Sequence, residues 1–546
     1  MPTFKLDGRS IPFEAGDTII KAAWRHGIEI PHYCWHPGLS APANCRMCLV
    51  EILPNPGQRP ITLDVLAWND ASHEYTTTQK PKLQPACRTA VTEGLDVLSD
   101  SSEHVRKARR DVQEFLLLNH PVDCPICDQS GECKLQDYWL EHGQFKKRMR
   151  DEPVHKPKAV EFGETIVYDG ERCVMCTRCV RFMAEVAKDP VLDMRERGNL
   201  NEIVVAPGRR LDGHYTFMTE HVCPVGALTT KDFRFKARVW FLRSASVVCQ
   251  GCATGCNAYL DYDPRHNKAY RHRPRDNARV NDFWMCDEGM LTYKEAHEGR
   301  VLGARLRGVE IPVAQALDQV RALFGGVSSS AVAIVLSAEH SLEDNWALHE
   351  LGTKLLGTEG VFFAARPEGY EDDILIHRDK NSNTRGVRSV APEAKPVGEL
   401  VGHVESGRVT HVISLGSTAL VVRDILARAT WLSLAAHEGV LPELATVVIP
   451  VTSWAEHSGT YVNSRGLRQV SDKALEPQGE SKAAWKVIGS VAAALGHDAS
   501  WRSLRAVRSE LLGIDEGGAT RPPSSSAIDE GGATRPPSSS PEGVPL

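Results

Sequence analysis

The spacing of apolar residues predicts a loop-rich first half of the chain and a second half in which helices and strands alternate. Short strands are predicted at residues 3–6 and 10–13, on either side of the turn Asp7-Gly8, and a helix is predicted from about residue 18 to residue 26. A further strand is predicted to start at Cys48. The first hundred residues are therefore expected to form a small sheet with one helix.

A longer helix is predicted over residues 102–119, because apolar side chains recur there at helical spacing. The predicted apolar face consists of Val105, Ala108, Val112, Phe115 and Leu116. The basic side chains fall largely on other faces, namely Arg106, Lys107, Arg109 and Arg110. They indicate either a solvated face or a docking surface for an acidic partner.

The stretch from residue 301 to residue 505 has the pattern of an α/β domain. Helices are predicted at 312–324 and, as an amphipathic helix, at 342–356, and strands at 331–338, 361–365, 409–415 and 446–450. Such alternation favours a largely parallel sheet. The stretch has no Gly-x-Gly-x-x-Gly motif between a strand and a helix and no Walker loop, so no nucleotide site is evident.

Length and charge restrict the class of protein. A chain of 546 residues is too long for one core and predicts three to five domains. The net charge of -6 argues against nucleic acid as the main partner. No apolar run reaches the roughly 20 residues that span a bilayer, and residues 1–8 lack the apolar core of a signal peptide. We expect a reducing compartment, and membrane contact through partner subunits alone.

The cysteines change this picture. The sequence has 15 cysteines, none after position 286, and clustered Cys-x-x-Cys motifs in a reducing compartment indicate metal rather than disulfides. Together with one histidine they form four sets of four ligands. These are set 1 (Cys34, Cys45, Cys48, Cys87), set 2 (His120, Cys124, Cys127, Cys133), set 3 (Cys173, Cys176, Cys179, Cys223) and set 4 (Cys249, Cys252, Cys256, Cys286).

The spacing within each set indicates its chemistry. Set 1 has the spacing C-x10-C-x2-C, which fits a [2Fe–2S] site whose loop offers backbone N–H groups to the sulfurs. Set 2 is compatible with zinc as well as with an iron–sulfur cluster. Set 3 has the ferredoxin spacing C-x2-C-x2-C, for which zinc is a poor alternative. Met183 stands where the ligand of a second cluster would follow, so Cys223 is expected to close the same cubane, with Met175 and Met183 packed around it.

Several motifs resemble the large iron–sulfur subunit of respiratory NADH:quinone oxidoreductase, or complex I. They are residues 31–34 and 44–51 around set 1, and residues 169–182 and 223–231 around set 3. The long gap between Cys48 and Cys87 departs from the family and is interpreted as an inserted hairpin or loop near 53–83. Set 4 is similar to the N-terminal cubane of molybdenum and tungsten oxidoreductases, and residues 456–469 resemble a loop of the molybdopterin-dinucleotide enzymes.

The resemblance implies a fold and a cofactor content. It implies a multidomain α+β and α/β protein, with a β-grasp [2Fe–2S] ferredoxin, ferredoxin-like [4Fe–4S] domains and a degenerate molybdopterin-oxidoreductase-like domain. The expected boundaries are 1–100, 101–150, 151–240, 241–300 and 301–505, with a disordered tail at 506–546 that repeats thirteen residues. One [2Fe–2S] cluster at set 1 and three [4Fe–4S] clusters at sets 2, 3 and 4 are implied, without molybdopterin.

The resemblance also implies a function. A flavin subunit takes hydride from NADH, and this chain passes electrons toward quinone, with set 4 off the path and no catalytic residue of its own. The implied partners are the flavin subunit, other peripheral-arm subunits and, indirectly, the membrane arm, at the cytoplasmic side of the bacterial inner membrane. The alternative is the catalytic subunit of an NAD-linked molybdenum formate dehydrogenase. An iron-hydrogenase would need further cysteines, and a third possibility is that set 4 only braces the fold.

Overall fold

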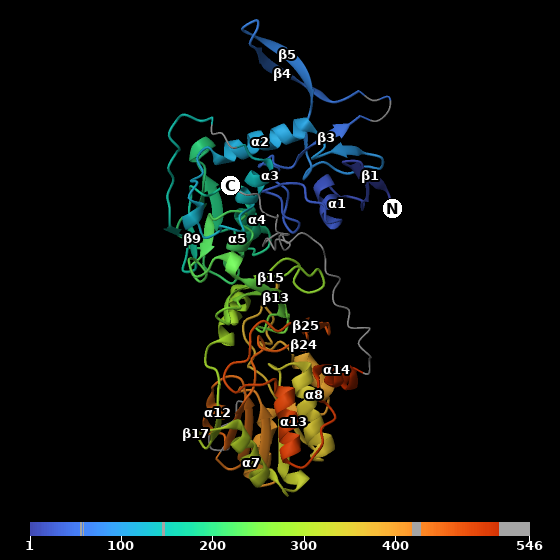
Figure 1. Ribbon diagram of the computed structural model, residues 1–546, viewed down its shortest axis with the longest axis vertical. Helices are drawn as coiled ribbons and strands as arrows, with labels where there is room; N and C mark the ends of the chain where they lie inside the picture. Colours follow the sequence, from blue (N-terminus) through green and yellow to red (C-terminus); the bar gives the residue numbers. More distant parts are fainter. Residues whose placement is uncertain (55–56, 58, 145–147, 418–426, 513–546) are drawn as a thin grey trace, which may run out of the picture. The chain divides into compact units, whose positions relative to one another are not determined.

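The computed structural model describes the chain except residues 55–56, 58, 145–147, 418–426 and 513–546 (Figure 1). It divides into two compact units, the first ending at Trp240 and the second beginning at Phe241. Sets 1, 2 and 3 lie in the first unit and set 4 lies in the second. Each unit is described separately below.

The first unit begins with a β-grasp domain, as predicted. Strands β1 (Thr3–Leu6), β2 (Arg9–Pro12), β3 (Leu49–Leu53), β6 (Gln84–Pro85) and β7 (Asp96–Leu98) form a sheet of order β2-β1-β7-β3-β6. Helix α1 (Ile19–Arg25) buries Ile19 and Ile20 against this sheet, in one core with Phe4, Val50 and Val97. Strand β3 pairs with β6 and β7, which places the ends of the cysteine loops of set 1 side by side.

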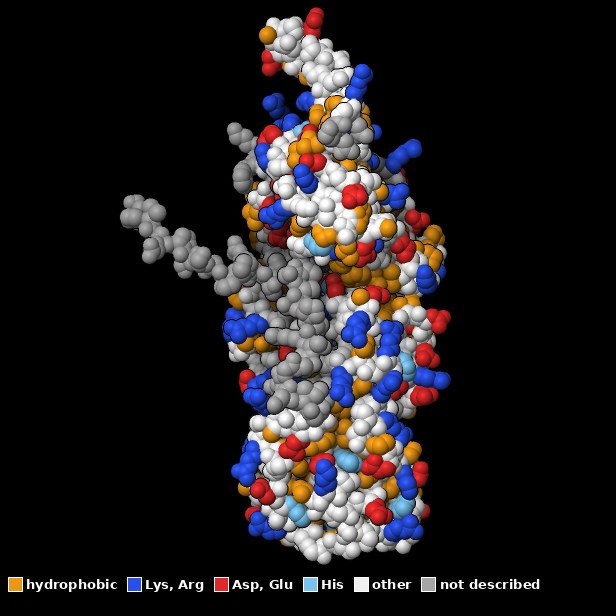
Figure 2. Space-filling view, turned by 90° about the vertical axis from the view of Figure 1, so that its right-hand side faces the viewer, with side chains coloured by type: hydrophobic (Ala, Val, Ile, Leu, Met, Phe, Trp, Pro, Cys, Tyr) orange, Lys and Arg blue, Asp and Glu red, His pale blue; other side chains and the backbone are white. Residues whose placement is uncertain are grey.

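The insertion in this domain is a hairpin of β4 (Thr62–Asn69) and β5 (Glu74–Pro81), which pair with each other in antiparallel register. Every residue of β5 is exposed, and Leu66 and Trp68 of β4 are exposed as well. Figures 1 and 2 show the hairpin extending from the β-grasp domain into solvent. The core of the domain is therefore complete without it.

Helix α2 (Glu103–Leu117) follows, capped by the Ser102 side chain, and then α3 (Lys134–His142). The buried face of α2 is the predicted one only in part: Val105 is buried, but so are Arg109 and Gln113, while Phe115 is 73% exposed. The reason is electrostatic: the buried Arg109 guanidinium pairs with Asp100 and donates to Ser99 Oγ at 2.6 Å. Arg109 is thus part of the core, whereas Arg106, Lys107 and Arg110 form exposed ion pairs.

The rest of the first unit is the ferredoxin-like domain that contains set 3. Strands β8 (Val160–Glu161), β9 (Ile166–Tyr168) and β12 (Leu228–Thr230) form one small sheet, and β10 (Leu192–Arg195) pairs with β11 (Glu202–Val205). Helix α4 (Arg178–Glu185) begins one residue before Cys179 and leads away from the cysteines. Helix α5 (Phe217–His221) leads toward them and ends two residues before Cys223.

The second unit starts with an antiparallel sheet of β13 (Arg243–Val248), β14 (Asn257–Asp263) and β15 (Lys268–Pro274), followed by α6 (Asp287–Leu291). A larger sheet comes next, of order β17-β16-β23-β22-β21-β18-β19-β20. Its strands are β16 (Ala304–Leu306), β17 (Val309–Ile311), β18 (Val332–Ser337), β19 (Gly360–Ala364), β20 (Lys395–Pro396), β21 (His411–Leu415), β22 (Thr430–Ala435) and β23 (Val447–Pro450). From β23 to β20 the pairing is parallel, as predicted.

Helices cover both faces of this sheet (Figure 1). One face packs against α7 (Val313–Phe324), α8 (Leu342–Glu350), α13 (Ala484–Ala494) and α14 (Leu504–Leu512), and the other against α10 (Val397–Glu405) and α12 (Val440–Leu444). The remaining elements are α9 (Thr384–Val390) and the hairpin of β24 (Gly459–Val462) and β25 (Arg468–Ser471). This is the α/β architecture expected for residues 301–505.

Two predictions for this unit need correction. Helix α8 is not amphipathic, because Leu342 to Leu348 are all buried, including Glu343 and Asp344, whose carboxylates have partners described below. It continues as a π-helix over Leu351–Leu355. The tail predicted from 506 starts too early, since α14 extends to Leu512; the two repeats lie outside the described residues. Among the described residues, no helix is long and apolar enough to cross a membrane.

Candidate iron–sulfur sites

Set 1 gathers around the end of strand β3. Cys34, Cys45 and Cys48 come from the loop between α1 and β3, and Cys87 follows β6, which pairs with β3. The thiols of Cys34 and Cys45 are hydrogen-bonded to each other, as are those of Cys48 and Cys87, and Cys45 lies close enough to act electrostatically on Cys48. The structure therefore brings all four predicted side chains together, despite the inserted hairpin.

The loop of set 1 presents backbone N–H groups to sulfur, as predicted. The Cys34 thiol and the N–H groups of Tyr33, Cys34 and Met47 lower the pKa of Cys45. The N–H of Tyr33 lies 3.5 Å from the Cys45 sulfur. Arg46, between the two close cysteines, has φ of 60°, and such a left-handed residue turns consecutive N–H groups toward a common anion. The thiolate, which is the form that binds metal, is thus favoured at Cys45, whereas the hydrogen bond to a neighbouring cysteine and burial raise the pKa of Cys34 and Cys48.

Set 2 is held at the ends of two helices and by a tight turn. His120 follows α2, Cys124 opens the 3-10 turn Cys124–Ile126, and Cys133 precedes α3. Burial lowers the pKa of His120 to about 4, so its imidazole is neutral at pH 7. Its buried Nδ1 has no hydrogen-bond partner in the part of the chain that the structure describes. A neutral imidazole with a free nitrogen has the donor chemistry of a metal ligand.

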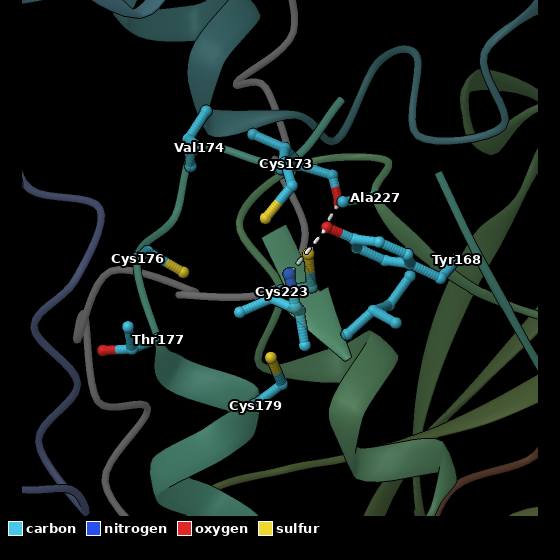
Figure 3. Close-up of a pocket in the computed structure, with 11 residues that line it drawn as sticks. Tyr168, Cys173, Val174, Cys176, Thr177, Cys179, Cys223 and Ala227 are labelled. Atoms are coloured by element: carbon cyan, nitrogen blue, oxygen red, sulfur yellow. Dashed lines mark hydrogen bonds between the residues drawn. The ribbon is translucent and has the colours of Figure 1, made fainter. Parts of the chain in front are cut away.

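Set 3 lines a small cavity (Figure 3). The sulfurs of Cys173, Cys176 and Cys179 point into it, and Cys223 lies beside them. The rest of the wall is almost entirely apolar apart from one tyrosine and one threonine: Tyr168, Val174, Thr177, Ile203, Val225, Ala227 and Leu228. Burial raises the pKa of three of these thiols to about 11, for Cys173, Cys176 and Cys223. An apolar cavity with four buried thiols fits a cluster whose iron replaces their protons.

The loop of set 3 has an unusual backbone. Met175 and Thr177 have φ of 50° and 62°, a region that residues other than glycine rarely adopt. As a result the Met175 N–H lies 3.4 Å from the Cys173 sulfur. Met183 is buried and belongs to helix α4, and the Met175 sulfur lies 3.6 Å from that of Cys173. Met175 therefore packs against a ligand of set 3, as predicted, whereas the packing of Met183 around the cluster stays a prediction.

Set 4 lies in the second unit, between β13, β14 and α6. Gly251 donates its N–H to the Cys249 sulfur at 3.4 Å, and Gly289 donates to the Cys286 sulfur at 3.3 Å. A Cβ atom at Gly289 would lie 3.0 Å from the Cys249 sulfur and 3.3 Å from that of Cys286. Burial raises the pKa of all three thiols for which a shift is resolved, those of Cys249, Cys256 and Cys286.

Sets 2 and 3 are in direct contact through backbone. The N–H of Lys134, next to Cys133, donates to the carbonyl of Pro224, next to Cys223, at 3.0 Å. Gly226, two residues further on, lies against set 2, because a Cβ atom there would be 2.5 Å from the Cys127 sulfur. The sequence alone had no signal for this contact, since it joins two loops that are far apart along the chain.

Set 1 contacts both of these sets. The Tyr33 hydroxyl donates to Gln113 Oε1 at 2.6 Å, and Gln113 Nε2 donates to the Leu135 carbonyl at 2.9 Å, close to set 2. Asn44 Nδ2 donates to the Met175 carbonyl of set 3 at 3.0 Å. Two arginines of helix α4 make further bonds between sets 1 and 3, considered below. Three sets of the first unit thus form one hydrogen-bonded body.

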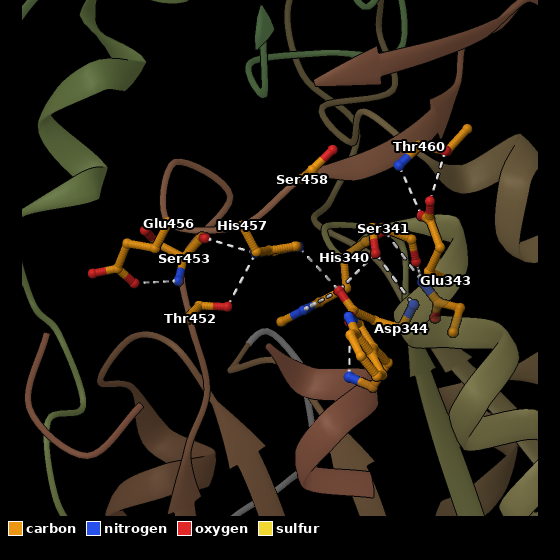
Figure 4. Close-up of polar contacts among 12 residues, drawn as sticks. His340, Ser341, Glu343, Asp344, Thr452, Ser453, Glu456, His457, Ser458 and Thr460 are labelled. Carbon is orange, nitrogen blue, oxygen red and sulfur yellow. Dashed lines mark hydrogen bonds and ion pairs between the residues drawn. The ribbon is translucent and has the colours of Figure 1, made fainter. Parts of the chain in front are cut away.

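The second unit contains a buried polar network at the loop that resembles the molybdopterin enzymes (Figure 4). Glu343 accepts from the Thr460 N–H and hydroxyl, each at 2.7 Å. Asp344 accepts from the Ser341 hydroxyl at 2.7 Å and lies 3.4 Å from His457. Burial opposes the charge of His457, but Asp344 outweighs it and raises the pKa of this imidazole. The network ties α8 to the loop and explains why the helix can bury two carboxylates.

Four family models match the chain. They are "2Fe-2S iron-sulfur cluster binding domain" over residues 1–102, "NADH-ubiquinone oxidoreductase-G iron-sulfur binding region" over 109–148, "NADH-quinone oxidoreductase subunit 3, ferredoxin-like domain" over 163–229 and "Molybdopterin oxidoreductase" over 436–494. The first three contain sets 1, 2 and 3, in that order. The fourth begins in the α/β domain and includes the loop of the polar network.

Curated relatives show the same assignment. The chain is 31% identical over 411 residues to the G subunit of the NADH-quinone oxidoreductase of Mycobacterium bovis, covering 74% of this chain and 48% of that one. It is 31% identical to NADH-quinone oxidoreductase subunit 3 of Thermus thermophilus, covering 67% and 48%. The mitochondrial 78 kDa subunit of NADH-ubiquinone oxidoreductase of Candida albicans is 27% identical, with 93% and 84% covered.

The chain spans about half the length of the bacterial relatives it matches. A solved NAD+-reducing [NiFe]-hydrogenase chain is 28% identical, with 44% of this chain and 91% of that chain covered, but the TM-score of 0.35 carries no argument about the fold. The chain belongs to the family of the large iron–sulfur subunit of NADH-quinone oxidoreductase, the subunit designated G or 3 in its relatives.

Proposed function

We propose that the chain is the electron-transfer subunit of an NADH:quinone oxidoreductase, which passes electrons from a flavin subunit toward quinone. Proton translocation belongs to the whole complex. The observation that carries the proposal is the hydrogen-bonded body of sets 1, 2 and 3, in which most of the cysteines are buried and the loops of each set are linked to those of the other two. A protein that only stored metal would not need three sites linked in this way.

The proposed cofactors are one [2Fe–2S] cluster at set 1 and [4Fe–4S] clusters at sets 2, 3 and 4. When bound, such clusters accept and release one electron at a time, at potentials that depend on charge, burial and hydrogen bonds. The chain supplies fifteen thiolates and, at His120, one neutral imidazole. It also keeps water away from set 3 through an apolar wall and directs N–H groups at the sulfurs of sets 1, 3 and 4.

The domain boundaries predicted within each unit, the partners and the location are parts of the same proposal. The partners would be the flavin subunit and other peripheral-arm subunits, with the membrane arm reached indirectly at the cytoplasmic side of the inner membrane. We propose no molybdopterin, because the α/β domain is short for two pterin-dinucleotide sites. The family assignment does not favour the alternative of a formate dehydrogenase subunit.

Substitution of one ligand tests the function in the assembled complex. Cys176→Ala removes a thiol from the cavity of set 3, and we expect NADH:quinone activity to fall at least a hundredfold while NADH:ferricyanide activity at the flavin subunit persists. Cys249→Ala in set 4 is the matched control and should retain quinone activity. Full quinone activity of an assembled Cys176→Ala complex would refute the proposal.

A further inference from the structure

Two arginines of helix α4 lie between set 1 and set 3. Arg178 and Arg181 flank Cys179 and are three residues apart, so their side chains lie on one face of the helix. The pattern Cys-Thr-Arg-Cys-Val-Arg in the sequence gave no reason to separate them from ordinary surface charges. In the structure, however, Arg178 is buried and Arg181 is half-buried.

The Arg181 guanidinium joins the two sets directly. Its Nη2 donates to the carbonyl of Cys34, a ligand of set 1, and to the carbonyl of Cys176, a ligand of set 3, the latter at 3.3 Å. Its Nη1 donates to the Ser40 carbonyl in the loop of set 1, and its Nε donates to Thr177 Oγ1 at 3.2 Å. The Arg181 side chain thus forms hydrogen bonds with the cysteine loop of set 1 and with the cysteine loop of set 3.

Arg178 repeats this arrangement one turn earlier. Its Nη2 donates to the carbonyl of Trp35, the residue after Cys34, and its Nη1 donates to the carbonyl of Val222, the residue before Cys223, at 3.4 Å. Neither guanidinium forms an ion pair with a carboxylate among the residues that the structure describes. Their hydrogen bonds are therefore made to the two cysteine loops, and the one nearby carboxylate that acts electrostatically on Arg181, Glu185, itself accepts from Ser40 in the loop of set 1.

The charges lie beside the ligands of both sets. Arg181 donates to the carbonyls of Cys34 and Cys176 themselves, and Arg178 donates to the carbonyls of the residues next to Cys34 and Cys223. The interaction of a cation with a nearby charge is screened less in a poorly solvated position than at the surface.

We propose that Arg178 and Arg181 are positioning residues for electron transfer, which hold the loops of sets 1 and 3 at a fixed separation and raise the reduction potentials of the clusters bound there. The proposal rests on the proposed function, because it requires clusters in both sets. Reduction adds negative charge to a cluster, and a nearby fixed cation stabilises that charge. Charge-assisted hydrogen bonds to the two loops make their spacing less variable than packing alone.

The test is a redox titration of the assembled complex monitored by electron paramagnetic resonance. In Arg181→Gln the midpoint potentials of the clusters in sets 1 and 3 should become more negative, while that of set 2 stays unchanged. Arg181→Lys keeps the charge and should restore the potentials, but it loses the planar fork, so the magnetic interaction between the two reduced clusters should weaken. Arg209→Gln is the matched control, because Arg209 forms an exposed ion pair with Asp189.

Failure of the proposed function and failure of the role of the arginines give different results. If the wild-type complex lacks the electron paramagnetic resonance signals of sets 1 and 3, the two sets hold no clusters and the proposed function is refuted. Wild-type signals together with unchanged potentials and unchanged magnetic interaction in Arg181→Gln would overturn the role of the arginines alone. If Arg181→Gln loses its clusters, Arg178→Gln and Arg178→Lys decide in the same way, since Arg178 bridges the same two loops.

Discussion

At the scale of single residues, His120 is the ligand that depends most on its surroundings. Its imidazole is buried and neutral, and its Nδ1 is without a partner among the described residues. We predict that His120→Cys changes the electron paramagnetic resonance spectrum of the cluster in set 2, and that the added thiolate charge makes its potential more negative. An unchanged spectrum with full iron content would show that His120 is a structural histidine at the end of a helix.

Gly226 provides a second test at this scale. A methyl group at this position would lie 2.5 Å from the Cys127 sulfur and 3.1 Å from Gln129 Cβ, so Gly226→Ala must displace the loop of set 2. Such overpacking costs about 1–3 kcal/mol. We expect the spectrum of set 2 to change although position 226 follows a ligand of set 3. Gly398→Ala, which meets no atom within 4 Å, is the control and should leave all spectra as they are.

The ligand residues and their partners differ in how far sequence could predict them. Most of the ligands are indicated by short, regular spacing, whereas the fourth cysteines of sets 1, 3 and 4 follow after long gaps and are assigned because they complete each set. Arg181 and Gly226 are not indicated by spacing, since each acts on a set from a distant part of the chain. A residue that joins two sites has no recognisable pattern in the sequence around it, so it can be identified only once the fold is known.

At the scale of elements, the β4–β5 hairpin is the part of the first domain that the sheet does not need. Strands β3 and β6 pair on either side of it, so the chain can close directly between them. We predict that replacing residues 55–82 with a two-residue Asn-Gly turn leaves the [2Fe–2S] spectrum of set 1 and the thermal stability of the chain unchanged. Loss of that cluster on deletion would mean that the hairpin supports the site.

Helices and strands were predicted well where the spacing of apolar residues determines which side chains are buried, and poorly where buried charged residues do. The parallel strands β18, β19 and β21 lie within a residue or two of the apolar runs that predicted them. For helices α2 and α8 the predicted division into a buried and an exposed face was incomplete, because each helix also buries charged side chains. Arg109 and Asp344 are stable there only because partners from other elements meet them, as Asp100 and His457 do, and a periodicity pattern cannot contain such partners.

At the scale of the whole molecule, the two units differ in what they contain. The first has three contacting sets, and the second has set 4 and an α/β domain whose polar network is satisfied internally. From the sequence we expected ligand sets up to Cys286 and an α/β domain behind them, and the second unit contains both set 4 and that domain. The sequence could not predict that sets 1, 2 and 3 touch, since their contacts depend on how the β-grasp and ferredoxin-like domains fold against each other.

The central claim is that the chain holds four iron–sulfur clusters and no other redox metal. Metal analysis of the purified, reconstituted chain tests it most directly. The account predicts 2 + 4 + 4 + 4, or about fourteen iron atoms per chain, and neither molybdenum nor tungsten. Iron near ten would mean that one cubane set is empty, with set 4 the first candidate. Stoichiometric molybdenum or tungsten would contradict the account and favour a molybdopterin-dependent enzyme.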